Sequence, residues 1–125
     1  MKHFIAALLC LTIVAVFCAV GSKASTDVID EILGVLHHVS TDAGKIPTEA
    51  RTAADDTLAL WEEKFFLISI FHPHQHLDEV KEKMVILDSY SDTEEYAEWK
   101  QAHASLEEAL LHLKGLLEAN IDNIM

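Results

Sequence analysis

The sequence has little that would support catalysis or covalent cross-linking. Its two cysteines, Cys10 and Cys18, both lie near the N-terminus, so no disulfide can form within the rest of the chain. Only two prolines and four glycines occur among 125 residues, which leaves no glycine-rich loop of the kind that cradles phosphate groups. Because no serine stands in a glycine-flanked elbow either, we expect no enzymatic activity and no cofactor.

Basic residues are also scarce, and this shortage limits the partners. Lys and Arg number 9 against 21 Asp and Glu, which gives a formal net charge of -12. Loss of the first 24 residues would remove two lysines and bring the charge to -14. Phosphate backbones and anionic lipid surfaces repel such a chain, so we expect no nucleic acid partner. The charge favours solubility and faster encounter with a basic patch on a protein partner.

A long apolar run at the start of the chain predicts a secretory signal peptide. The run extends from Phe4 to Val20, only Thr12 interrupts it, and Lys2 gives it a positive start. The alternative is a membrane anchor, for which the run is short, since a span needs about 20 apolar residues.

Small residues mark a cleavage point after the run. Ser22 and Ala24 occupy the −3 and −1 positions of a cut after Ala24. We therefore assign residues 1–24 to the signal peptide and residues 25–125 to one secreted domain, which has no membrane contact after cleavage.

Apolar residues at helical spacing predict an all-α fold for this domain. Since two helices are long and two are short, and the connections are short, the economical arrangement is an antiparallel bundle of about four helices without disulfides. The expected helices span about 27–40, 47–71, 74–88 and 92–123.

The second expected helix has Pro47 at its first position, where a missing N–H costs nothing. After Lys64 it is apolar on nearly all sides, which predicts that this part lies at the centre of the fold. A buried strand over 65–71 is the rival interpretation, and the unbroken helical period from Ala54 argues against it.

The last expected helix shows the clearest pattern. Ser91 and Glu94 fit a capping box, in which each side chain bonds a backbone amide of the first turn. Apolar residues then recur at alternating steps of three and four. This seam consists of Tyr96, Trp99, His103, Leu106, Leu110, Leu113, Leu117, Asn120 and Ile124. A helix of this length also allows a homodimer.

Three histidines surround the second proline. His72, His74 and His76 could bind Zn²⁺ or Cu²⁺ where the backbone is extended, since imidazole is a good ligand for both ions. The structural interpretation is a solvated turn between helices, which we favour because a structural site needs about four ligands. A turn that responds to pH is a third interpretation.

His103 occupies a core position in the last helix. It is either a buried pH sensor or a core histidine whose ring bonds a neighbouring polar group, and we favour the second interpretation.

Aromatic residues are concentrated in two stretches. Trp61, Phe65, Phe66, Phe71, Tyr96 and Trp99 could line a pocket for a small apolar ligand. Aromatic residues at helical spacing are equally typical of a hydrophobic core, which is the interpretation that we favour.

Two stretches resemble a known family. Leu60-Trp61-Glu62-Glu63-Lys64-Phe65 with Ile68-Ser69-Ile70-Phe71, and Tyr96-Ala97-Glu98-Trp99-Lys100, are similar to the anophensin/albicin group of anopheline mosquito salivary proteins. The resemblance implies a small acidic secreted protein that inhibits host plasma proteins, in the alternative complement pathway or in contact activation and kinin release. It identifies no residue that binds the partner.

The leading prediction is therefore a secreted, non-enzymatic protein that binds a host plasma protein through a basic patch on that partner. An extracellular carrier of a small apolar ligand and a histidine-rich metal-binding protein are the alternatives.

Overall fold

The computed structural model describes residues 1–42, 44–72 and 74–124, with the side chains of 71 and 120–124 left out of the description. Within these residues the chain forms four α-helices and no strand. They are α1 (Lys2–His37), α2 (Ala50–Phe71), α3 (His74–Tyr90) and α4 (Tyr96–Ile124). Cys10 and Cys18 are free thiols. The all-α prediction is confirmed.

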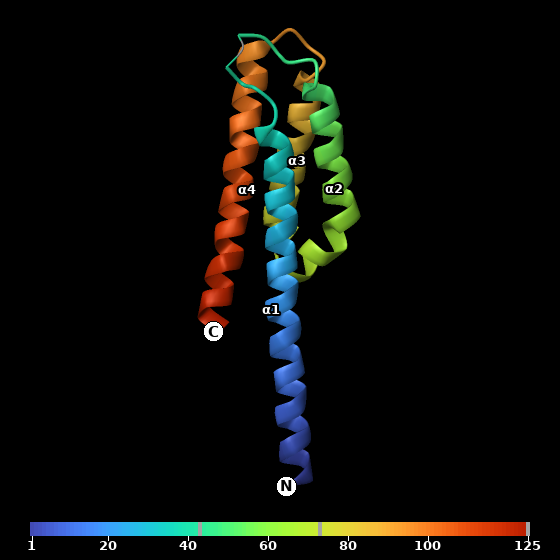
Figure 1. Ribbon diagram of the computed structural model, residues 1–125, viewed down its shortest axis with the longest axis vertical. Helices are drawn as coiled ribbons and strands as arrows, with labels where there is room; N and C mark the ends of the chain where they lie inside the picture. The colour runs from blue at the N-terminus through green and yellow to red at the C-terminus, as the bar shows by residue number, and fades with distance from the viewer. Residues whose placement is uncertain (43, 73, 125) are drawn as a thin grey trace.

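The helices form an up-and-down bundle from which one helix projects (Figure 1). Helix α1 packs against α2 and α4, and α3 packs against the same two neighbours from the other side. The connections α1–α2 and α3–α4 lie at one end of the bundle. The α2–α3 turn lies at the other end, from which the first half of α1 extends alone.

Helix α1 is much longer than the helix expected over 27–40. It begins at Lys2, ends at His37, and its 36 residues span about 54 Å. The helix passes without a break through the expected cleavage point, where the Thr26 hydroxyl donates to the carbonyl of Ser22 at 3.0 Å. In the full-length chain no separate helix starts near Asp27, because nothing between Val20 and Asp27 interrupts the backbone ladder; the start expected for a chain cleaved after Ala24 stays a prediction.

Helix α2 begins three residues later than expected. Pro47 belongs to the preceding turn, in which its carbonyl accepts the Ala50 N–H at 3.1 Å. The N-cap is Glu49, whose side chain makes no capping hydrogen bond. Pro47 therefore ends the loop rather than opening the helix.

The capping box expected at the start of α4 is not formed. The Ser91 hydroxyl turns back and donates to the carbonyl of Asp88 at 2.6 Å, at the C-terminal end of α3. The Thr93 hydroxyl likewise donates to the carbonyl of Tyr90 at 2.8 Å. The same two carbonyls also accept the backbone N–H groups of Ser91 and Thr93. Both side chains thus belong to the turn that ends α3, and α4 begins at Tyr96 rather than near residue 92.

The seam of α4 from Trp99 to Leu117 fills the centre of the bundle as expected, and the side chains of Asn120 and Ile124 lie outside the described residues. Trp99 and Trp61 are each 1 % exposed and lie in one continuous core with the α1 and α3 side chains. The completely buried members of the seam are Leu106, Leu110, Leu113 and Leu117. This seam packs against helices of the same chain, so it is buried inside the bundle and does not face outward.

The end of α2 departs from expectation. Ile68 is completely buried, but Phe66 is 78 % exposed and Ile70 is 48 % exposed. The prediction that this part of the chain is surrounded by protein is therefore wrong. The main neighbours of α2 are α1 and α3, and the side chains of Phe66 and Ile70 lie outside these contacts.

Polar contacts join neighbouring helices at the surface of the core. Lys114 Nζ of α4 lies 2.7 Å from Asp30 Oδ1 of α1, and Lys83 Nζ of α3 donates to Ser105 Oγ of α4 at 2.7 Å. Lys81 of α3 pairs with Glu62 of α2. Exposed pairs of this kind each contribute less than about 1 kcal/mol, so their main effect is to fix the order of the helices.

Candidate functional site

The point where α1 enters the bundle is the first site of interest. Gly21, Ser22 and Ser25 are buried there, and Ser25 is completely inaccessible to solvent. The bond after Ala24, which the sequence identifies as the cleavage point, lies inside this packed helix. Proteases cut exposed and locally unfolded segments, so cleavage at this bond would have to precede folding of the full chain.

The half of α1 outside the bundle is apolar on all sides. Its large side chains are exposed, from 54 % at Leu8 to 71 % at Phe4. Within the described residues, α1 is the one helix long and apolar enough to cross a membrane. Residues 3–22, between the first two lysines, carry no charge, but Gly21 and Ser22 are buried in the bundle. The part outside the bundle, residues 3–20, spans about 27 Å, against about 30 Å for a hydrocarbon core. A signal peptide and a membrane anchor are both consistent with this segment.

An apolar groove follows this half of α1. Its volume is about 580 Å³, and the end of α2 closes it on one side with Leu67. The α1 residues that line it are Thr12, Ile13, Val16, Phe17, Val20, Gly21 and Ala24. Because residues of both helices line this groove, the last turns of α2 lie beside the end of the apolar run.

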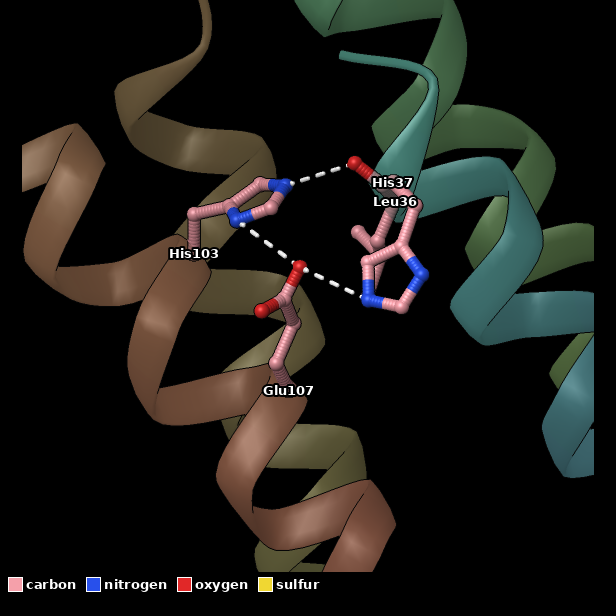
Figure 2. A network of polar contacts seen from close by, with 4 residues as sticks. All are labelled: Leu36, His37, His103 and Glu107. Atoms are coloured by element: carbon pink, nitrogen blue, oxygen red, sulfur yellow. Dashed lines mark hydrogen bonds and ion pairs between the residues drawn. The ribbon is translucent and has the colours of Figure 1, made fainter. Parts of the chain in front are cut away.

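A buried polar network fastens the other end of α1 to α4 (Figure 2). The side chain of His103 is 5 % exposed, and its Nε2 lies 3.0 Å from the carbonyl oxygen of Leu36. Because a carbonyl only accepts, Nε2 carries a hydrogen and donates it. Nδ1 of the same ring lies 3.5 Å from Glu107 Oε1, an oxygen that is also 3.5 Å from His37 Nε2. The interpretation of His103 as a core histidine with a polar partner is confirmed.

The network has a structural rather than a catalytic geometry. The ring of His103 packs against Trp99 with centroids 5.6 Å apart, and one of its nitrogens is committed to a backbone carbonyl. Nδ1 can donate to Glu107 only when the ring is doubly protonated. No nucleophile of the kind that a histidine base activates takes part in the contacts of the network (Figure 2).

The three histidines around the α2–α3 turn have separate environments. His72 is buried and ends α2 in an extended conformation, whereas His74 is exposed at the start of α3. His76 faces α4, where its ring lies edge-on to His112 with centroids 6.2 Å apart. No three His, Cys, Asp or Glu side chains among the described residues are grouped to hold a metal ion.

The aromatic residues are divided between core and surface. Trp61 and Phe65 form one ring pair on α2, and Tyr96 and Trp99 form another on α4. An open groove of about 380 Å³ contains Trp61 and Phe65, but Glu62, Asp78 and Lys81 form the rest of its lining. Phe66 points outward, and the side chain of Phe71 lies outside the described residues. The described aromatic side chains therefore do not enclose one apolar cavity, and the carrier function gains no support.

A carboxyl pair near the end of α3 was not identified from the sequence. Burial, a hydrogen bond with Asp55 and repulsion from Asp55 and Asp92 raise the pKa of Asp88, and nearby Arg51 opposes the shift. Asp55 and Asp88 come from different helices at distant positions in the chain, so no local pattern indicates their contact. Arg51 also pairs with Asp92 at 2.9 Å, which ties the start of α2 to the α3–α4 loop.

Comparison with known proteins gives a family for the bundle. A family model described as a domain of unknown function, DUF4363, matches residues 29–124. No curated protein and no solved structure matches the chain. The matched range covers the bundle and omits the apolar half of α1. These findings do not bear on the resemblance to anopheline salivary proteins, so inhibition of host plasma proteins stays a prediction.

Replacement of His103 tests the network in Figure 2. We expect His103→Leu to lower the free energy of unfolding by about 1–2 kcal/mol, because it removes a buried hydrogen bond between α4 and the end of α1. Urea unfolding of the full chain in mild detergent at neutral pH would measure this loss. His37→Leu is the control, since that side chain is 63 % exposed, and should change stability by less than about 0.5 kcal/mol. Equal losses in both variants would contradict the assignment.

The buried ring of His72 should make stability depend on pH. Burial, assisted by repulsion from His76, lowers the pKa of His72 from 6.5 to about 4. Below pH 6.5 the ring stays neutral in the folded state, whereas in the unfolded chain it binds a proton. The contribution of the neutral ring to the free energy of unfolding is therefore complete above pH 6.5 and is lost as the pH falls toward 4. We expect a loss of about 1–2 kcal/mol, below the full linkage value because water reaches part of the turn.

Thermal unfolding at a series of pH values between neutral and 4.5 would show the His72 effect. His72→Leu should flatten the profile in this range, because the variant has no ring to protonate. His74→Gln changes an exposed histidine two residues away and should retain the profile of the natural chain. If the two variants give the same profile, His72 is not the group responsible.

Proposed function

This chain belongs to the DUF4363 family, a domain of unknown function, and we propose that it is a non-enzymatic binding domain held at a membrane by its own first helix. In this proposal the apolar half of α1 stays in the bilayer. The bundle is then displayed on the exported side, where it binds a partner protein.

The continuity of α1 is the observation that carries the proposal. One helix contains both the span-length apolar segment and core residues such as Ile29 and Ile32, which are completely buried. Removal of residues 1–24 would take away Gly21 and Ser22, which pack inside the bundle. Cleavage would therefore remove part of the domain itself, which supports retention of the helix.

Whether the apolar segment is cleaved off or retained, the domain that follows it is exported. A signal peptide and an uncleaved anchor share the short positive start and the apolar run, and both carry the following domain across the membrane. The secreted protein predicted from the sequence and the tethered protein proposed here thus differ in one event, cleavage after Ala24.

The charge of the bundle supports a protein partner with a basic surface. The cations of the described bundle are largely engaged with carboxylates, in pairs that involve Arg51, Lys64, Lys81, Lys100 and Lys114. The 21 acidic residues all follow residue 24, so most of them remain to act on an approaching molecule. Such a field accelerates the encounter with positively charged proteins.

The size and location of the natural product test the tether. In cells that export the protein, we expect a chain of the full 13.9 kDa that stays in the membrane pellet after alkaline washing and dissolves only in detergent. The physical reason is that an uncharged helix of about 20 residues is stable in hydrocarbon. Mass spectrometry and fractionation measure both properties.

Ala24→Leu is the matched control, because it removes the small residue that cleavage requires. It should leave the size and location of a tethered chain unchanged, whereas it would move a secreted chain into the membrane fraction. A natural product that starts at Ser25 and appears in the medium would refute the tether and favour the secreted binding protein.

The salt dependence of partner capture tests the second part of the proposal. With the full chain in detergent as bait, we expect partners that are basic and that associate more slowly as ionic strength rises, because the Debye length falls to about 8 Å at physiological salt. Surface plasmon resonance on the captured protein measures the association rate. Reproducible capture of acidic partners only, with rates insensitive to salt, would be evidence against this mode of binding.

A further inference from the structure

The outward face of α2 changes character along its length. Its exposed residues follow one another at steps of three and four, and they form the outer line of α2: Thr52, Asp56, Ala59, Glu63, Phe66 and Ile70. The line is polar or small through Glu63 and then ends in two large apolar side chains, which are 78 % and 48 % exposed. The change is abrupt and occurs in the last two turns of the helix.

These two turns lie at the end of the bundle from which the apolar half of α1 emerges (Figure 1). Leu67, the residue after Phe66, lines the same apolar groove as Val20 and Ala24 of α1. The end of α2 is therefore level with the end of the apolar run. If α1 stays in the membrane as proposed, the end of this run lies at the bilayer surface, and the last two turns of α2 lie beside it.

From this placement we infer that the end of α2 is a lipid-contacting surface, in which Phe66 and Ile70 enter the outer boundary of the bilayer beside α1. The inference rests on the proposed retention of α1 in the membrane. Amphipathic surfaces of this kind bury apolar side chains about 5–10 Å into the region between headgroups and acyl chains. The contact would give the bundle a second point of attachment and would fix its tilt relative to α1.

The neighbouring charges fit a lipid surface. Lys23 is exposed one turn beyond Val20, and Lys64, which lies 3.8 Å from Glu63 and is 41 % exposed, lies two residues before Phe66. Lysine ammonium groups at this depth can reach headgroup phosphates while their stems follow the apolar surface. A second copy of the chain would bring a surface of the same negative charge, so the bilayer is the better occupant.

A fluorescent probe at residue 70 tests the contact. The full chain with Cys10→Ser, Cys18→Ser and Ile70→Cys would be labelled with an environment-sensitive dye and reconstituted, highly diluted, in phosphatidylcholine vesicles. Lipids with a nitroxide near the headgroup end of the acyl chain should quench about half of its fluorescence if residue 70 lies in the boundary region. Ala59→Cys, an exposed position on the same outer line, is the matched control and should show almost no quenching.

A third probe separates failure of the contact from failure of the tether. In a chain with Cys18→Ser alone, the label sits on the natural Cys10, which lies in the middle of the apolar half of α1. Strong quenching of this label by nitroxides deep in the bilayer supports the tether. If Cys10 is quenched while residue 70 behaves like residue 59, the lipid contact is wrong and the tether stands.

Two other outcomes also decide the question. If the Cys10 label is not quenched, the tether fails and the lipid contact fails with it. If the label at residue 70 shows an apolar emission spectrum without nitroxide quenching, protein rather than lipid covers the end of α2, and the inference is overturned. Adding Phe66→Ser to the Ile70→Cys chain should reduce the quenching, because it removes the remaining large apolar side chain of the pair.

Discussion

The backbone hydrogen bonds of α1 are the constraint on which the arrangement of this protein depends. A helix satisfies its own N–H and C=O groups, so one element can pass from a hydrocarbon layer into a protein core without exposing an unpaired group. Around Gly21 the surroundings of α1 change while its backbone does not. The direction of the apolar half is therefore fixed relative to the bundle. The same continuity fixes how far each of the other helices lies from the apolar half.

The bundle itself is held by packing, because its part of the chain contains no cysteine. The buried leucines of α4 and the two tryptophans form a core that also contains the α1 side chains Ile29 and Ile32. Outside this core, lysines of one helix pair with carboxylates of a neighbouring helix, as Lys81 does with Glu62 and Lys114 with Asp30. The buried bond from His103 to Leu36 then fixes where the last turn of α1 meets α4.

The sequence patterns predicted where the helices lie more accurately than the residues at which they begin and end. The seam from Trp99 to Leu117 was predicted and is buried, because a period sustained over many residues has one explanation. The expected starts at Pro47 and near residue 92 were wrong. Pro47 lies in the turn before α2, which its fixed φ also suits, and a short polar side chain such as Ser91 can bond the backbone of a following helix or of a preceding one. The approach of His76 to His112 joins two helices, and no local pattern indicates it.

The sequence by itself determined the all-α class, the absence of disulfides from the bundle, the acidic surface and the presence of an apolar N-terminal segment. Each of these depends on composition or on short-range periodicity. Only the tertiary structure decided that this segment continues into the core through Ser22 and Ser25, and that Phe66 and Ile70 face outward. The physical reason is that burial depends on which helices become neighbours, and the main neighbours of α2, α1 and α3, leave Phe66 and Ile70 exposed.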